Sequence, residues 1–200
     1  MKSDSIIRIM DSIYGKRDSF TIEEFNNVDT LLLSRLGYDN SVLEVDFNDL
    51  LNFSNLETLT VDGCVLDQNA IAIISKLKKL NRLSFYNCEI IEDIYPIFDD
   101  IHVKELSLCS TNFDLSLLKG NYNKLHLEAI EFKKLDCTVS VLDIFGCEIN
   151  DFDSLFETSF DVVVVSSIQY LSNQLRFDDS GRKIVVMEDN GQFVSQKVGF

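Results

Sequence analysis

The stretch Leu56–Leu66, LETLTVDGCVL, places apolar side chains at offsets 0, 3, 5, 8 and 10. We number its eleven positions as slots 1 to 11, so that apolar residues fill slots 1, 4, 6, 9 and 11. In slots 4 to 6, Leu59 and Val61 flank Thr60. This alternation is typical of a β-strand that buries one face and exposes the other.

The pattern recurs along the chain, with copies that begin at residues 56, 80, 103, 122, 139 and 160. Successive copies are separated by 24, 23, 19, 17 and 21 residues, and a shorter copy precedes them at Val28, Leu31, Leu33 and Leu36. A single strand cannot bury its apolar face alone, so repetition at this period predicts stacked repeats with a parallel sheet and one continuous core. The later copies fill the five apolar slots with Leu80, Leu83, Phe85, Cys88, Ile90; Val103, Leu106, Leu108, Thr111, Phe113; Tyr122, Leu125, Leu127, Ile130, Phe132; Val139, Leu142, Ile144, Cys147, Ile149; and Phe160, Val163, Val165, Ile168, Tyr170.

These copies resemble the leucine-rich-repeat pattern LxxLxLxxN/CxL over about residues 28 to 170. Two segments, Ile90–Phe98 (IIEDIYPIF) and Ile149–Phe156 (INDFDSLF), look like the I-x-D-I-x-P-L segment of the bacterial internalin-type variety. The resemblance implies an α/β leucine-rich-repeat solenoid, a short horseshoe with a parallel concave β-sheet, in a bacterial or phage protein. Slot 9 lacks the family's asparagine, and the 19- and 17-residue spacings are short for it.

One proline and eight glycines among 200 residues leave no visible linker, so we expect a single domain over 1–200. Because the ends of a solenoid expose its core, we assign 1–27 to an N-terminal cap, 28–170 to the repeats and 171–200 to a C-terminal cap. Thr21 and Glu24 have capping-box spacing, and Asn190-Gly191 between two β-rich runs predicts a hairpin. The apolar residues Ile6, Ile7, Ile9, Met10 and Ile13 favour an amphipathic cap helix.

The connections between strands differ in length. The segment Asp67–Leu80, DQNAIAIISKLKKL, predicts a helix because Asp67 is a suitable N-cap and apolar residues follow at helical spacing. The segment Phe113–Asn121, FDLSLLKGN, is too short for one and predicts a 3₁₀ turn.

Cysteines occupy slot 9 in three copies, as Cys64, Cys88 and Cys147. Slot 9 is where the chain turns from the strand into the core, and a small, weakly polar side chain fits there. The five cysteines form no CxxC pair, and the sequence contains no HExxH motif or glycine-rich phosphate loop. We therefore expect structural cysteines, no metal ion and no cofactor.

The charge balance is strongly acidic, with 18 basic and 33 acidic residues and a formal net charge of −15. Such a surface repels nucleic-acid phosphates and anionic lipid and favours a protein partner of basic character. No apolar run approaches the roughly 20 residues of a membrane span. Asp4, Arg8 and Asp11 interrupt any signal-peptide core, so a cytoplasmic location is expected.

Slots 3, 5, 7 and 8 should face solvent on the concave side of the sheet. In the middle copies these slots combine charged and aromatic side chains, the composition of a protein-binding hot spot. We therefore expect a non-enzymatic protein-binding module. The predicted partner-binding residues are Arg82, Tyr86, Lys124, His126, Glu128, Asp143 and Phe145. At the C-terminal end, Val141, Val162 and Val164 need a cover, which either the C-terminal segment or a partner supplies.

An alternative reading starts from the acidic residues that follow the strands, among them Glu148, Asp151 and Asp153. They favour an acidic inhibitor or immunity-type protein that blocks a basic enzyme such as a nuclease.

A catalytic reading rests on Cys109, His126 and Asp143, which fall on three successive predicted strands. They could act as nucleophile, base and orienting acid if they lined up on the solvent face. A flat sheet offers no closed pocket and no evident oxyanion hole, so we interpret them as surface residues and expect no catalytic site.

Overall fold

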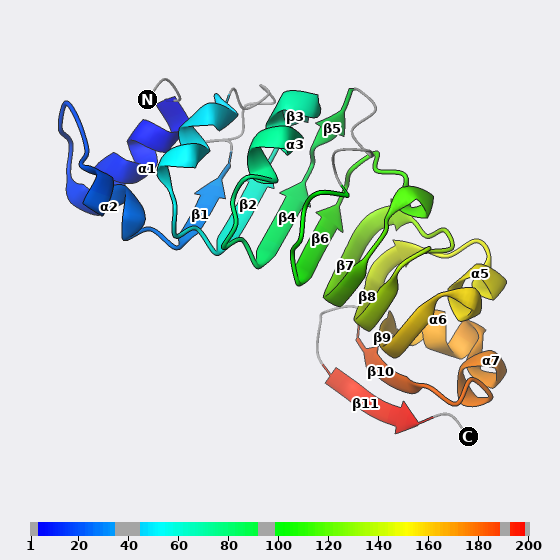
Figure 1. The fold of residues 1–200 in the computed structure, drawn as a ribbon. Coiled ribbons are helices and arrows are strands. Elements are labelled where there is room, and N and C mark those ends of the chain that lie inside the picture. The colour runs from blue at the N-terminus through cyan, green and yellow to red at the C-terminus, as the bar shows by residue number, and fades with distance from the viewer. Residues whose placement is uncertain (1–3, 35–44, 92–98, 189–192, 199–200) are drawn as a thin grey trace. The chain divides into compact units, whose positions relative to one another are not determined.

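The computed structural model describes residues 4–34, 45–91, 99–188 and 193–198. The chain divides into two compact units, Met1–Val103 and Lys104–Phe200, each built on a β-sheet (Figure 1).

Among its described residues, the first unit contains three parallel strands in the order β1-β2-β4. A second parallel pair, β3 with β5, follows the ends of β2 and β4. Its elements are α1 (Asp4–Tyr14), α2 (Ile22–Asn26), β1 (Thr30–Leu33), the 3₁₀ helix η1 (Phe47–Asn52), β2 (Thr58–Asp62), β3 (Val65–Leu66), α3 (Gln68–Ile74), β4 (Arg82–Tyr86) and β5 (Glu89–Ile90).

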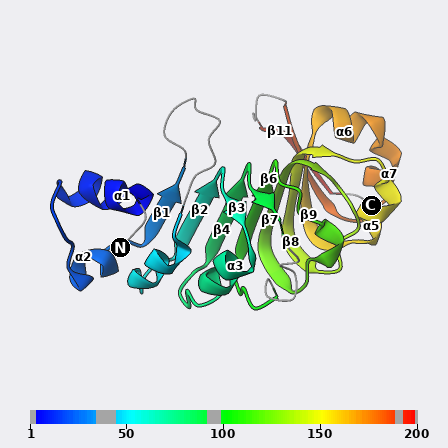
Figure 2. The same ribbon diagram turned by 90° about the horizontal axis from the view of Figure 1, so that it is seen from above.

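The described part of the second unit contains six strands in the order β6-β7-β8-β9-β10-β11, parallel except for the antiparallel pair β10 and β11. The helices α5, α6 and α7 gather on one side of this sheet beside β9 and β10 (Figures 1 and 2). Its elements are β6 (Glu105–Cys109), the 3₁₀ helix η2 (Leu115–Leu117), β7 (Asn121–Glu131), β8 (Thr138–Glu148), α5 (Phe152–Glu157), β9 (Ser159–Ser166), α6 (Ser167–Ser172), α7 (Gln174–Asp178), β10 (Lys183–Met187) and β11 (Phe193–Val198).

Strand register within each unit follows the slots of the sequence pattern. In the first unit, slot 4 aligns Leu59 with Leu83. In the second, the same slot aligns Leu106 with Leu125, Leu125 with Leu142 and Leu142 with Val163. All of these side chains are buried. The predicted α/β leucine-rich-repeat fold with a parallel sheet is confirmed.

Both predicted caps have the expected elements. At the N-terminus, α1 buries Ile6 and Met10, and α2 begins with the predicted capping box. The Glu24 amide donates to Thr21 Oγ1 at 3.2 Å, while the Thr21 amide donates to Glu24 Oε2 at 2.8 Å. At the C-terminus, β10 and β11 form the antiparallel pair of a hairpin. The turn residues Asn190-Gly191 lie outside the described residues, as do Leu36 and most of the Ile90–Phe98 segment.

The connections Asp67–Leu80 and Phe113–Asn121 have the predicted local structures, with one difference in length. Asp67 caps α3 by accepting from the Ala70 amide at 2.7 Å, but the helix ends at Ile74 instead of continuing to Leu80. The Phe113–Asn121 segment contains η2, which Asp114 caps by accepting from the Ser116 amide at 3.1 Å.

The slot-9 cysteines lie in the core, as predicted. Cys64, Cys88 and Cys147 are 2%, 3% and 8% exposed. The Cys88 thiol donates to the Tyr86 carbonyl at 3.3 Å, and the Cys147 thiol donates to the Leu127 carbonyl at 3.1 Å. Burial raises the pKa of Cys147 to about 12, so its thiol stays protonated and can donate.

The last copy of the pattern departs from prediction after Val165. Ile168 and Tyr170 were expected in slots 9 and 11, but both lie on α6, and Ile168 is 64% exposed. The cause is a second capping box, in which Ser166 and Gln169 begin a helix where earlier copies turn into the core. The side-chain nitrogen Nε2 of Gln169 also donates to the backbone carbonyls of Ile144 and Cys147 at 3.0 and 2.9 Å.

Slot 8 has a backbone role that the sequence pattern did not show. Gly63, Asn87, Ser110 and Ala129 occupy it in successive copies, with φ of 74°, 50°, 50° and 50°. This left-handed conformation follows the last residue of β2, β4 and β6, whereas at Ala129 it lies within β7; in each copy the next side chain, in slot 9, turns toward the core. It favours glycine, and Ala129 has no polar side chain to offset its cost.

We expect Ala129→Gly to stabilise the protein by up to about 1 kcal/mol, because glycine adopts a positive φ without the steric penalty that alanine meets. Ala129 is exposed, so removing its methyl group opens no cavity. Urea denaturation measures the change. Ala72→Gly, inside α3, is the matched control and should destabilise by about 1 kcal/mol. Equal losses in both variants would contradict the assigned strain.

Candidate functional site

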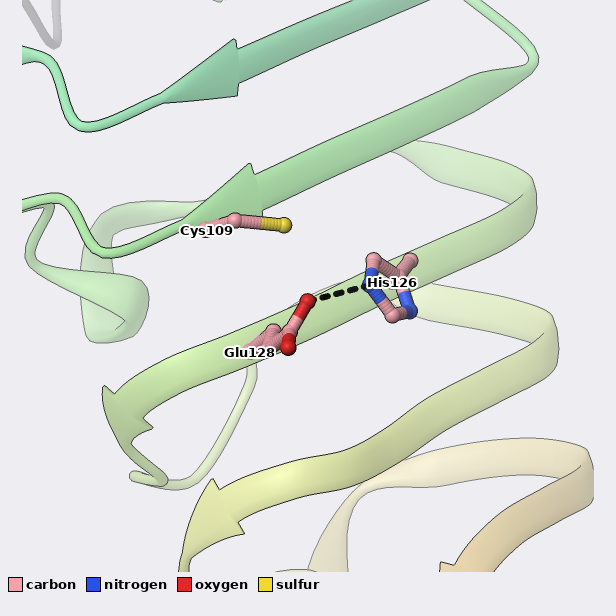
Figure 3. A group of neighbouring side chains, drawn as sticks. All are labelled: Cys109, His126 and Glu128. Atoms are coloured by element: carbon pink, nitrogen blue, oxygen red, sulfur yellow. Dashed lines mark ion pairs between the residues drawn. The ribbon is translucent and has the colours of Figure 1, made fainter. Parts of the chain in front are cut away.

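Five side chains from three adjacent strands of the second unit meet on the face of the sheet opposite the core. Cys109 ends β6, Lys124, His126 and Glu128 alternate along β7, and Asp143 lies on β8. We call these five residues the His126 cluster. Figure 3 shows Cys109, His126 and Glu128 at its centre.

Asp143 fixes one side of the imidazole ring. The register pairs His126 with Asp143, and Asp143 Oδ2 lies 3.1 Å from His126 Nδ1 in an ion-pair contact. The same oxygen lies 3.5 Å from Lys124 Nζ. The backbone amide of Phe145 donates to Asp143 Oδ1 at 3.4 Å. Asp143 is therefore held by its own strand while it faces two cationic groups.

These contacts shift the pKa values of both partners. The Asp143 carboxylate and then Cys109 raise the pKa of His126 to about 10, against the lowering effect of burial. Burial alone would raise the pKa of Asp143, but His126 and Lys124 outweigh it and hold that pKa below its ordinary value. At neutral pH the pair is thus an imidazolium beside a carboxylate.

We expect the His126 imidazole to remain protonated across neutral pH in chelator-treated protein and to titrate near pH 10. Because the folded pKa exceeds the unfolded value, this contact contributes its full stability below pH of about 6.5 and loses it as pH rises through the folded pKa. A two-dimensional NMR titration of the ring resonances measures this, with His126→Gln for assignment. Asp143→Asn should move the titration to lower pH, and an unchanged midpoint would contradict the assigned cause.

Glu128 reaches the other ring nitrogen because of a register shift between β7 and β8. After His126 pairs with Asp143, Glu128 pairs with Gly146 of slot 8 instead of Phe145 of slot 7. A Cβ atom on Gly146 would lie 2.7 Å from Glu128 Cγ, so only glycine leaves room for this side chain. Glu128 Oε2 then lies 3.6 Å from His126 Nε2 (Figure 3).

Cys109 differs from its predicted position. It was expected on the solvent face in line with His126, but it is 3% exposed and pairs with Glu128, whereas His126 pairs with Ser107. Cys109 and His126 are diagonal neighbours on β6 and β7, and their side chains still lie close together. The thiol of Cys109, a nitrogen of His126 and a carboxylate oxygen of Glu128 all lie within 4.8 Å of one another. These three atoms are of the kinds that bind transition-metal ions.

The remaining predicted site residues lie apart from this cluster or at its edge. Arg82 and Tyr86 lie on β4 of the first unit, where Arg82 is exposed and Tyr86 is half-buried. Phe145 is half-buried on β8. The structure thus brings together Lys124, His126, Glu128 and Asp143. Among the valines that needed a cover, Val141 and Val162 are half-buried and Val164 is 9% exposed.

The aligned slots, the buried parallel strands and the capped ends define an α/β leucine-rich-repeat fold. The structure is similar to the crystal structure of an internalin (inlF) from Listeria monocytogenes, with a TM-score of 0.54 and 17% sequence identity. The match covers 94% of this chain and 65% of the internalin chain, so this chain spans less than two thirds of that protein's length. At this identity the likeness establishes the fold.

No protein-family model matches the sequence, and no curated protein shows significant similarity to it. Within the described residues, no helix combines the length and apolar character needed to cross a membrane.

Proposed function

We propose that this chain is a non-enzymatic protein-binding module that uses the solvent-facing slots of its strands. Leucine-rich-repeat folds are typically protein-binding and usually non-catalytic, because stacked strands offer an extended surface. The proposed contact residues are Arg82, Tyr86, Lys124, His126, Glu128, Asp143 and Phe145.

The observation that carries this proposal is the mutual fixing of charges in the His126 cluster. Lys124, His126 and Glu128 contact each other or Asp143 at 3.1 to 3.6 Å, and the side chain of Glu128 is 53% exposed. Charged groups that are already held in place lose less side-chain entropy when a partner binds. Phe145 on the same strand as Asp143 supplies apolar area beside them.

The alternative, an acidic inhibitor of a basic enzyme, is favoured by the net charge of −15. Its acidic residues already have structural roles, however. Asp151 caps α5 by accepting from the Asp153 amide at 2.9 Å and the Ser154 hydroxyl at 2.7 Å. Asp153 pairs with Arg176 at 3.0 Å. These contacts favour the strand face over the acidic edge as the principal binding surface.

Affinity capture from the native host, followed by mass spectrometry, would supply the partner, and calorimetry would then separate the two surfaces. Under the proposal, Tyr86→Ala and Phe145→Ala each weaken partner binding by about 2 kcal/mol. Asp151→Asn and Asp153→Asn have little effect on the affinity. Leu171→Ala, at a side chain on α6 that is 68% exposed, is the control for loss of apolar area elsewhere.

The acidic-inhibitor alternative predicts the opposite. The aspartate variants would weaken binding, the aromatic variants would not, and affinity would fall steeply between low and physiological salt. That combination of results would overturn the choice of surface.

A further inference from the structure

The His126 cluster presents three different ligand atoms to one point in space. Cys109 supplies a thiol from β6, and His126 and Glu128 supply an imidazole nitrogen and a carboxylate oxygen from β7 (Figure 3). We propose that Cys109, His126 and Glu128 bind one divalent transition-metal ion of the zinc class. This goes beyond the proposed protein-binding function and does not depend on it.

The distances suit a tetrahedral ion after a small adjustment. With metal–ligand bonds of about 2.0–2.3 Å, ligand atoms of a tetrahedral site lie about 3.4 Å apart. His126 Nε2 and Glu128 Oε2 are 3.6 Å apart, and all three ligand atoms lie within 4.8 Å of one another. The side chain of Glu128 is 53% exposed and can close the remaining gap by rotation.

The ring of His126 is oriented as metal-binding histidines usually are. Asp143 Oδ2 lies beside Nδ1, which leaves Nε2 directed to the side where Glu128 lies. The carboxylate beside Nδ1 favours a proton on that nitrogen and so leaves Nε2 as the ligand atom. Asp143 is thus a positioning residue for the site.

The backbone around Glu128 is also specialised. The register shift between β7 and β8 places Gly146 opposite Glu128, and a side chain there would occupy the space of Glu128 Cγ. Bulges of this kind commonly re-aim a side chain next to a functional site. The regular pairing of slot 7 with slot 7 would instead have placed Phe145 opposite Glu128.

The set of ligand atoms selects the class of ion. A thiolate, an imidazole and one carboxylate suit zinc and its neighbours, whereas magnesium and calcium need several oxygen ligands. Binding displaces the thiol proton and any proton on His126 Nε2 to the solvent, since metal ligands must be deprotonated. Three protein ligands leave a fourth position for water, on the side where the exposed carboxylate of Glu128 gives access.

Cobalt(II) is the probe, because it replaces zinc in tetrahedral sites and its absorption spectrum depends on the ligands that bind it. Chelator-stripped, reduced full-length protein would be titrated with Co²⁺ while the absorption spectrum is recorded. We expect saturation at about one equivalent per chain, with a thiolate-to-cobalt charge-transfer band and intense visible bands, both abolished by added Zn²⁺.

Four variants assign the signal. Cys109→Ala should remove the charge-transfer band, and Glu128→Ala should weaken Co²⁺ binding by at least about tenfold. Asp143→Asn should weaken it by about 10–100-fold while the band keeps its position, as expected for a residue that acts through His126. Cys137→Ala, at another buried cysteine of the second unit, is the matched control and should bind as wild type. Circular dichroism checks that each variant is folded.

The proposal is overturned if Co²⁺ does not saturate a single site, if the band persists in Cys109→Ala, or if Glu128→Ala binds as tightly as wild type. If Cys109→Ala fails to fold, the Glu128→Ala and Asp143→Asn variants still test whether the metal ion binds at this site. None of these outcomes bears on protein binding through Tyr86 and Phe145.

Discussion

Leu83→Asp should abolish the cooperative unfolding transition of the first unit or lower its stability by about 4 kcal/mol or more. Leu83 is fully buried on β4, where it aligns with Leu59 of β2. A carboxylate at this position would lose its hydration beside apolar side chains such as Leu59. Urea denaturation followed by circular dichroism measures the loss.

Ser84→Asp is the matched control, because it adds the same charge one residue further along the same strand. Ser84 is only partly buried and faces the opposite side of the sheet. Its substitution should change stability by less than about 1 kcal/mol. If Leu83→Asp and Ser84→Asp unfold alike, the assigned slots are wrong.

Phe177→Ala should be the second most damaging substitution, with a loss of about 3–5 kcal/mol. Phe177 is fully buried on α7, and its ring contacts those of Phe152, Phe156 and Tyr170 at centroid distances of 5.9, 5.4 and 5.8 Å. Removing the ring leaves a cavity that three other aromatic rings line and cannot fill by simple movement.

Leu175→Ala, two residues away on the same helix, is the control. Leu175 is 80% exposed, so its truncation should change the denaturation midpoint little. Phe177→Leu should recover part of the loss, since it retains apolar volume. Equal effects of Phe177→Ala and Leu175→Ala would show that α7 does not stabilise the second unit.

The sequence predicted the strand register because burial determines it. A shift of one residue would turn Leu125 and Leu127 from the core to solvent. The apolar slots are therefore compatible with only one alignment of neighbouring strands. The alignment of Tyr122 with Val139 followed even though their copies are only 17 residues apart. Local capping signals worked equally well at Asp67 and at Thr21 with Glu24, because each depends on side-chain hydrogen bonds within four residues.

The predictions that were wrong concern positions where the repeat pattern is no longer regular. Ser166 and Gln169 have capping-box spacing in the sequence, and this spacing predicts α6 in place of a sixth full copy of the pattern. The register shift at Gly146 was not visible, since a glycine in slot 8 also fits the regular pattern, as Gly63 shows. The burial of Cys109 was missed because the alternation of the pattern places slot 7 on the solvent-facing side, and alternation does not record how much of a side chain its neighbours cover.

The same limits explain why the candidate site was only partly anticipated. Lys124, His126, Glu128 and Asp143 were predicted to share a face, and they do. Their distances and pKa values depend on how side chains of adjacent strands rotate, which no spacing in one sequence records. The combination of Cys109, His126 and Glu128 has no short motif, because 17 residues and a change of strand separate the thiol from the imidazole.

The register shift between β7 and β8 also limits how this protein could be lengthened. A regular stack grows by duplication of any repeat, since each copy presents the same edges to its neighbours. The pair β7 and β8 breaks that equivalence, because Glu128 fits only against a partner that has slipped by one residue and offers Gly146. A duplicate of another repeat placed between them would separate Asp143 from His126 and present a side chain where Gly146 leaves space. The His126 cluster therefore depends on the direct adjacency of β6, β7 and β8. Repeats added by design should be inserted elsewhere, so that these three strands remain neighbours.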